Sequence, residues 1–351
     1  MLKRVVSMFL VAALLFVGFP LSIKANANGG LSLLRVSEVS LGAEHALALA
    51  ADGTVWAWGR NNNGQLGDGT TTNRNEPVQV SGLTGVIAIA AGGGHSLAVK
   101  SDGTVWAWGY NNYSQLGDNT TTNSSTPIQV GGLSGVIAVS AGASHSLALK
   151  SNGTVSSWGY NNRGQLGDGS TTTRKTPVNI NNFTGIASIS AGASHSLSVK
   201  GDGTVWGWGE NSDNQLGVTN TLIIGPTNRT SPVQMSNSTN SKMAAGGDKH
   251  SIVLRNDGRV WATGLNSNGQ LGDGSTTKRT TPVQLGSPTG VLAIAAGATH
   301  SLAVKNNGTV WAWGLNSSGQ LGDGTTTQRT SAVQVSGIAG AISVSAATVW
   351  R

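Results

Sequence analysis

Short apolar stretches alternate with polar residues at every second position through most of the chain. Three of them, Val86–Ala90, Leu97–Val99 and Val105–Trp108, follow one another closely, and a period of two is typical of β-strands. Asp102-Gly103 separates the second from the third and predicts a type I′ hairpin turn, whose two central residues need positive φ. A fourth short strand is predicted at Pro77–Val80 of the preceding unit, with proline at its start, where no ladder donor is needed.

This four-strand unit recurs along the chain, marked by one histidine in each copy. The intervals are 50 residues, except for one of 55, between His45, His95, His145, His195, His250 and His300. A single four-stranded sheet cannot bury both of its faces, whereas radial stacking of such sheets buries them. The repeats therefore predict an all-β fold, a β-propeller with four-stranded blades of about 50 residues. An open β-solenoid is the alternative, disfavoured because solenoid coils are usually shorter.

The repeated motif resembles that of the regulator of chromosome condensation repeat family. The resemblance lies in Ala-Ala-Gly-x-x-His-Ser-Leu-Ala-Val (90–99), Asp-Gly-Thr-Val-Trp-Ala-Trp-Gly (102–109) and Asn-x-x-x-Gln-Leu-Gly-Asp (111–118), and it covers residues 36–346. It implies a seven-bladed propeller. Secreted bacterial β-lactamase inhibitors have propellers of the same type, so the resemblance also allows inhibition of an extracellular enzyme.

The number of blades does not follow directly from the repeats. Six near-complete copies are present, but the first strand type occurs seven times, from Val36–Val39 to Ile342–Ser345, and Thr348–Arg351 then follows as if a strand and turn had been skipped. Either six blades close and leave one strand over, or a seven-bladed ring lacks most of one blade. We favour the second interpretation, six near-complete repeats plus a truncated seventh.

The N-terminal segment has the pattern of a secretory signal peptide. Two basic residues precede the apolar run Val5–Pro20, and Ala25-Asn26-Ala27 has the small-x-small pattern of a cleavage site. We expect residues 1–27 to be removed and 28–351 to form a single propeller domain, secreted or at the cell surface, with no membrane span after cleavage. A retained anchor is the alternative, although the run is shorter than the roughly 20 residues of a spanning helix.

Charge and cysteine content narrow the possible functions. Loss of Lys3, Arg4 and Lys24 lowers the formal charge from +7 to +4, and the remaining basic residues are scattered. A nucleic-acid partner is therefore not expected, since no basic cluster with interleaved aromatics is present. The chain has no cysteine, which excludes disulfides and thiolate chemistry.

The residues that recur in every repeat are predicted to be structural. We expect the histidines to hold turns rather than a metal, because each belongs to a different blade. Paired tryptophans such as Trp56 and Trp58 share one strand face and are expected to be buried between blades. Nine of the 15 acidic residues occupy turn positions. Of the others only Glu210 and Asp213 could form an acid/base pair, and the sequence predicts neither an enzyme nor a cofactor.

A partner-binding site is expected where the repeats differ from one another. Two variable positions follow the tryptophan strand, and all three tyrosines of the chain fall there beside arginines, the residue types that dominate binding hot spots. An insertion between Gly217 and Pro232 adds an apolar run. The predicted partner-binding residues are Arg60, Tyr110, Tyr113, Tyr160, Arg163, Glu210, Asp213, Leu222, Ile223 and Ile224.

These observations lead to one functional hypothesis and two alternatives. The hypothesis is a secreted, non-enzymatic, monomeric propeller that binds an extracellular or cell-envelope protein and could inhibit an enzyme. The family resemblance implies the first alternative, guanine-nucleotide exchange on a small GTPase with chromatin association, which export argues against. The second is a carbohydrate-binding or carbohydrate-active propeller, which would need exposed aromatic faces lying together.

Overall fold

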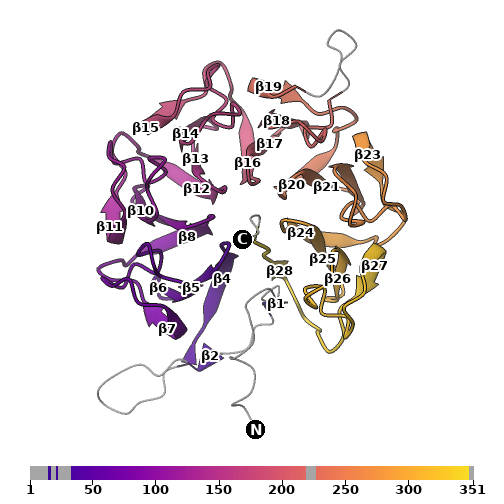
Figure 1. Cartoon of the computed structure of the whole chain (residues 1–351), viewed down its shortest axis with the longest axis horizontal. Coiled ribbons are helices and arrows are strands. Elements are labelled where there is room, and N and C mark those ends of the chain that lie inside the picture. Colours follow the sequence, from indigo (N-terminus) through magenta and orange to yellow (C-terminus); the bar gives the residue numbers. More distant parts are fainter. Residues whose placement is uncertain (1–14, 17–20, 23–32, 219–226, 348–351) are drawn as a thin grey trace.

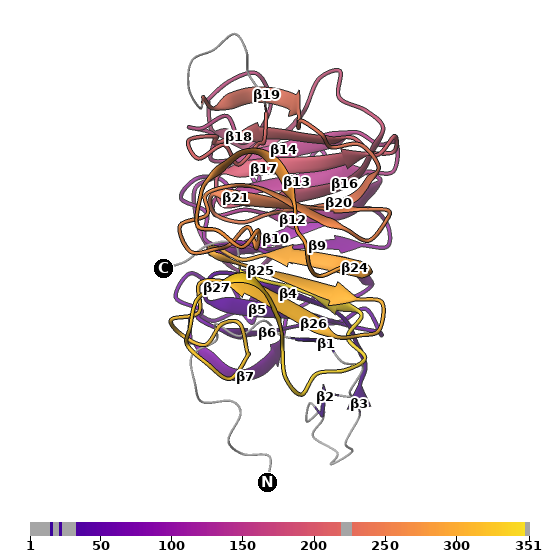
Figure 2. The same cartoon turned by 90° about the vertical axis from the view of Figure 1, so that its right-hand side faces the viewer.

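The computed structural model describes residues 15–16, 21–22, 33–218 and 227–347. In these ranges all regular structure is β, so they hold no helix long and apolar enough to span a membrane. Six four-stranded antiparallel sheets stand radially around a central axis (Figure 1), and Figure 2 shows the ring edge-on. The predicted β-propeller is confirmed.

Each blade runs outwards from the axis in chain order, and its strands are numbered accordingly. Blade 1 comprises β4 (Val36–Leu41), β5 (His45–Ala50), β6 (Val55–Gly59) and β7 (Arg74–Gln79). Blade 2 comprises β8 (Val86–Ala91), β9 (His95–Lys100), β10 (Val105–Gly109) and β11 (Ser124–Gln129). Blade 3 comprises β12 (Val136–Ala141), β13 (His145–Lys150), β14 (Val155–Gly159) and β15 (Arg174–Asn179). Blade 4 comprises β16 (Ile186–Ala191), β17 (His195–Lys200), β18 (Val205–Gly209) and β19 (Arg229–Gln234). Blade 5 comprises β20 (Ser241–Gly246), β21 (His250–Arg255), β22 (Val260–Gly264) and β23 (Arg279–Gln284). Blade 6 comprises β24 (Val291–Ala296), β25 (His300–Lys305), β26 (Val310–Gly314) and β27 (Arg329–Gln334).

The hairpin between the second and third strands has a turn type other than the predicted type I′. Gly103 has a φ of 77°, but Asp102 does not have positive φ. The Gly103 N–H donates to the Lys100 carbonyl at 2.8 Å, and the Lys100 N–H donates to the Thr104 carbonyl at 3.0 Å. This three-residue loop is a type I turn followed by a left-handed glycine. The aspartate is favoured because its carboxylate accepts hydrogen bonds from the N–H and hydroxyl of Thr104.

The fourth strand begins earlier than the sequence indicated. β7 starts at Arg74, so Pro77 lies inside the strand rather than at its start. The strand forms the outer edge of its blade, and its register against β6 shifts between Ala57 and Gly59. Proline is tolerated there because an edge strand has one side without ladder partners.

Seven inner strands surround the axis, and the seventh belongs to a truncated blade. β28 (Ser343–Val344) pairs with β1 (Leu15–Phe16), while β2 (Leu21–Ser22) pairs with β3 (Leu33–Leu34). The Leu41 N–H donates to Ser345 Oγ at 3.1 Å, which repeats the contact of Ala91 N–H with Ser40 Oγ between blades 1 and 2. The predicted truncated seventh blade is thus confirmed. Removal of residues 1–27, which include β1, stays a prediction.

Packing between neighbouring blades forms the core, and the two tryptophans of a pair contribute differently. The second tryptophan is fully buried where it is Trp108, Trp158, Trp208 or Trp313. The first one was also expected to be buried but is only half-buried, because it lies closer to the hairpin turn. In blades 2, 4, 5 and 6 a basic side chain covers its ring, as Lys200 Nζ does 4.5 Å from the Trp206 centroid.

Candidate partner-binding surface

Five of the six recurring histidines connect their blade to the next. His145 Nε2 lies 2.9 Å from Ser196 Oγ, and that hydroxyl donates to the Gln165 carbonyl at 2.8 Å. Trp208 Nε1 donates to the same carbonyl at 2.9 Å. Because Ser196 donates its only hydroxyl proton to the Gln165 carbonyl, its oxygen must accept the proton of His145 Nε2. The predicted structural role is confirmed, but the hydrogen bond of the ring goes to the neighbouring blade and not to its own turn, where Nδ1 has no partner.

Burial keeps these histidines neutral. It lowers the pKa of His145 to about 3, and the pKa values of the other five lie at about 3 or 4. With Nε2 donating, a second proton would go to Nδ1, which is buried without a hydrogen-bond partner in His145. A charged ring would therefore leave a buried donor unsatisfied.

The seam at the truncated blade lacks this connection. Buried His300 Nε2 has no hydrogen-bond partner, and blade 1 has Ala46 where the other five blades have serine after the histidine. Trp58, which faces the seam, is 9% exposed, whereas its equivalents are fully buried. The replacement of serine at position 46 is the sequence signal that could have located this seam.

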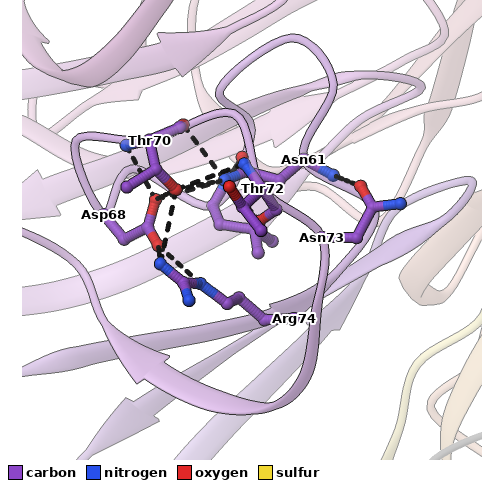
Figure 3. Close-up of polar contacts among 7 residues, drawn as sticks. Asn61, Asp68, Thr70, Thr72, Asn73 and Arg74 are labelled. Atoms are coloured by element: carbon purple, nitrogen blue, oxygen red, sulfur yellow. Dashed lines mark hydrogen bonds and ion pairs between the residues drawn. The ribbon is translucent and has the colours of Figure 1, made fainter.

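The loop after the third strand is held by a buried asparagine (Figure 3). Asn61 Nδ2 donates to Asp68 Oδ1 at 3.1 Å and to the Thr72 carbonyl at 3.1 Å, and Arg74 Nε donates to Asp68 Oδ2 at 2.9 Å. Burial raises the pKa of Asp68, but hydrogen bonds from Thr70 and Arg74 outweigh it and lower that pKa overall. The predicted turn role of this aspartate is confirmed, and the loop is a rigid support for the variable residues.

The variable residues lie at one end of the ring, which we call the loop face. The Tyr110 N–H donates to the Gly94 carbonyl at 2.8 Å, and the Arg60 N–H donates to the Glu44 carbonyl at 2.8 Å. The loop after the third strand therefore contacts the turn between the first and second strands in each blade. The hairpin turns lie at the opposite end, which we call the hairpin face.

The three tyrosines meet on the loop face across the border of blades 2 and 3. The Tyr113 and Tyr160 ring centroids are 4.4 Å apart, and those of Tyr110 and Tyr113 are 6.3 Å apart in an edge-on arrangement. Tyr113 is 40% exposed, and the other two are half-buried. We call these three residues the tyrosine cluster. Aromatic side chains that contact one another in solvent, outside the core, are suited to anchor a partner.

The predicted arginines do not join the tyrosine cluster. Arg60 forms an ion pair with Glu44 on blade 1. Arg163 is exposed on the loop of Tyr160, and its backbone N–H donates to Gln165 Oε1. The predicted apolar run Leu222–Ile224 lies outside the described residues.

Glu210 and Asp213 form a charged group on blades 4 and 5 instead of an acid/base pair. Ser212 Oγ donates to both carboxylates, and Asp213 pairs with Lys249 at 3.4 Å and Lys278 at 3.9 Å. The neighbouring Asp248 was not predicted. Burial raises its pKa, and the Glu210 and Asp213 carboxylates raise it further while Lys249 opposes them. Across the described ranges no three acidic or histidine side chains are grouped to hold a metal.

Short stretches of the chain are similar to two human proteins. The chain is 46% identical over 56 residues to the E3 ubiquitin-protein ligase HERC2 of Homo sapiens, covering 16% of this chain and 1% of that protein. It is 46% identical over 54 residues to RCC1 domain-containing protein 1 of Homo sapiens, covering 15% of this chain and 14% of that protein. The matches thus span only a small part of these relatives.

Solved structures and the family profile match over most of the chain. Human WBSCR16 superposes with a TM-score of 0.77 at 26% identity, over 86% of this chain and 82% of that one. Prp20p of Saccharomyces cerevisiae, at 24% identity and a TM-score of 0.77 over 86% of this chain and 77% of that one, shares the fold. The profile of the RCC1-like domain matches residues 18–349. This chain belongs to the RCC1-like domain family.

Proposed function

We propose that this chain is a secreted binding propeller that holds an extracellular or cell-envelope protein on its loop face, with the tyrosine cluster as the anchor. The observation that carries the proposal is the contact of all three tyrosines, from two blades, at one exposed place. Tyrosine offers a large contact area and a hydroxyl at low entropic cost, which makes it common at the centre of interfaces.

The rigid scaffold supports this proposal. Tyr110 and Tyr113 flank Asn111, which is fully buried and donates to Asp118 and the Thr122 carbonyl. The backbone under the rings is therefore fixed before binding, so little entropy is lost on association. Exposed Arg163, on the loop of Tyr160, adds a charged donor to the same surface.

The carbohydrate-binding alternative has less support. A site built from the tryptophans needs their faces to be open and to lie together, but the second tryptophan of each described pair is at most 9% exposed. In most blades a basic side chain lies over the ring of the first tryptophan, as Arg255 lies 3.8 Å from the Trp261 centroid. The guanine-nucleotide exchange alternative needs a small GTPase and chromatin, which a secreted protein would not meet.

We expect Tyr113→Ala to weaken partner binding by about tenfold or more, since a hot-spot residue contributes about 2 kcal/mol. The measurement is affinity capture from culture and envelope fractions, followed by titration of the captured protein. Ser318→Ala is the matched control, because Ser318 occupies the Tyr113 position in blade 6. Equal binding by the Tyr113 variant would place the site elsewhere, and no capture by any chain would refute the binding function.

Secretion and inhibition are tested on the same material. N-terminal sequencing of the protein released into the medium should begin at about residue 28. If the captured partner is an enzyme, its activity should fall as the propeller is added. The Tyr113→Ala variant, added at the same concentrations, should inhibit that enzyme less. Released protein that retains its N-terminus would contradict the signal peptide.

A further inference from the structure

The hairpin face carries exposed aliphatic side chains at one repeated position. Each of the six complete blades has a β-bulge between the first and third residues of its inner strand, and a bulge re-aims the residue that it inserts. Ile87, Ile137 and Leu292 occupy this position and are 50%, 49% and 46% exposed, and Ile342 of the truncated blade is 67% exposed. These four residues form what we call the apolar crescent.

The members of the apolar crescent lie on two pairs of neighbouring blades. They belong to blades 6, 7, 2 and 3, and Ser37 of blade 1 interrupts the series. The inner strands begin at the hairpin face, because the Val86 N–H donates to the carbonyl of Gly53 in the neighbouring hairpin turn at 3.0 Å. Apart from Tyr113, they are the large apolar residues that are exposed within the described ranges. Such a grouping marks an interaction surface.

Basic residues accompany the apolar crescent. The last residue of the second strand pairs with the first residue of the inner strand, so Lys100 lies opposite Val86, next to Ile87. Lys150 and Lys305 are placed in the same way beside Ile137 and Leu292. Blades 4 and 5 add basic side chains at Lys200, Lys242, Arg255 and Arg259.

Carboxylates on this face compensate only part of the positive charge. The hairpin turns hold Asp52, Asp102, Asp202 and Asp257, but blades 3 and 6 have Asn152 and Asn307 instead. These are two of the three complete blades that carry the crescent, so the cations beside Ile137 and Leu292 have no aspartate in their own turn. The crescent therefore combines aliphatic side chains with excess positive charge.

We propose that the hairpin face docks on an anionic lipid bilayer, with the apolar crescent entering the interface and the flanking lysines contacting phosphate headgroups. Aliphatic side chains beside lysines are the combination that binds such surfaces. Nucleic acid is disfavoured because its phosphate backbone offers nothing to aliphatic groups. The two faces would then have separate roles, since the tyrosine cluster points to the opposite side.

The path of the chain favours a bilayer over an acidic protein as the occupant. The Ala51 N–H donates to the Arg35 carbonyl at 2.7 Å, so the first inner strand is entered at the hairpin face. The apolar run Val5–Pro20 precedes that point in the sequence. The sequence that leads into this face is thus apolar, as the crescent is, and its composition suits lipid rather than an acidic protein.

Vesicle flotation of the full chain tests this proposal. The vesicles are phosphatidylcholine alone, or phosphatidylcholine mixed equally with phosphatidylglycerol. We expect at least about tenfold stronger binding to the anionic vesicles, and weakening when salt is raised from about 0.1 M to about 0.5 M. A combined Ile87→Ser, Ile137→Ser, Leu292→Ser variant should bind about tenfold or more weakly. All variants share the N-terminal run, so their differences report on the crescent.

Two matched controls isolate the crescent. Ala187→Ser changes the equivalent position in blade 4, and Tyr113→Ser changes the opposite face; both should bind vesicles as the parent does. An unchanged thermal transition would show that the triple variant is folded. Equal binding by the triple variant, equal binding to neutral and anionic vesicles, or no binding would overturn the proposal. Self-association that the triple variant abolishes, without vesicle binding, would assign the crescent to a second copy instead.

Discussion

Gly142→Ala is expected to lower the free energy of unfolding by about 3 kcal/mol or more, at the upper end of what overpacking costs. A Cβ at Gly142 would lie 2.5 Å from His145 Nδ1 and 2.6 Å from the carbonyl oxygen of Gly192 in the next blade. The first atom belongs to a ring held by a hydrogen bond to Ser196, and the second to the backbone. Neither can move without opening the border between blades 3 and 4.

Urea unfolding followed by circular dichroism measures this effect. Gly131→Ala is the matched control, because no heavy atom lies within 4 Å of the place its Cβ would take and its φ is not positive. It should leave stability within about 0.5 kcal/mol. Adding His145→Ala to Gly142→Ala should cost less than the sum of the single changes, because the ring is one of the two colliding groups. Strict additivity would contradict the proposed collision.

Acidification from about pH 7 to about pH 5 is expected to remove most of the stability of the fold. The six histidines have folded-state pKa values of about 3 or 4, whereas in the unfolded chain they titrate near 6.5. Because their folded pKa is depressed, the stability they contribute is complete above the unfolded pKa and is lost as pH falls. Each contributes about 1.4 kcal/mol per pH unit in that window.

One buried carboxyl opposes this trend. Burial raises the pKa of Glu38 to about 7, although a hydrogen bond from the Ile89 backbone lowers it. The folded state therefore binds a proton at Glu38 in the window where the unfolded state binds protons at the histidines. The difference of about five protons gives a slope of roughly 7 kcal/mol per pH unit near pH 5.5. Since domains are stable by about 5–15 kcal/mol, the protein should unfold above about pH 4.

Urea unfolding at a series of pH values tests the acid prediction. His300→Gln is the informative variant, because His300 Nε2 lacks a partner and its replacement breaks no hydrogen bond to the next blade. The slope should decrease by about one fifth in this variant, because one of about five net protons is removed. The turn carboxylates change the stability only at lower pH. Burial raises the pKa of Asp323, but hydrogen bonds from Thr325 and Arg329 lower it to about 2 overall. Stability that is constant from pH 7 to pH 5 would refute the neutral, buried histidines.

The sequence predicted the tyrosine cluster only in part. It placed Tyr110, Tyr113 and Tyr160 at variable turn positions of adjacent repeats, and neighbouring repeats of a propeller are neighbours in space. The ring contacts themselves depend on the border between two blades. Arg60 was grouped with them for the same reason, but it pairs with Glu44 in its own blade, which a comparison of repeats does not reveal.

The apolar crescent escaped the sequence analysis because a bulge breaks the alternation on which strand prediction depends. In Val86-Ile87-Ala88 the residue at position 87 was counted as an ordinary strand position, whereas the register against β9 skips it. Two adjacent large apolar residues at the start of an inner strand are the signal that remains. Only the pairing register showed that the second of them is exposed.

The sequence by itself determined the strands and the blade repeat, because alternation, turn glycines and motif spacing are local properties that recur in every copy. It favoured a truncated seventh blade, but the choice between six and seven inner strands around the axis came from the structure. The tertiary structure decided what lies between the copies. His145 is adjacent to Ser146 in the chain, yet it bonds to Ser196 of the next blade. Such contacts depend on the angle at which blades meet around the axis, and no local pattern encodes that angle.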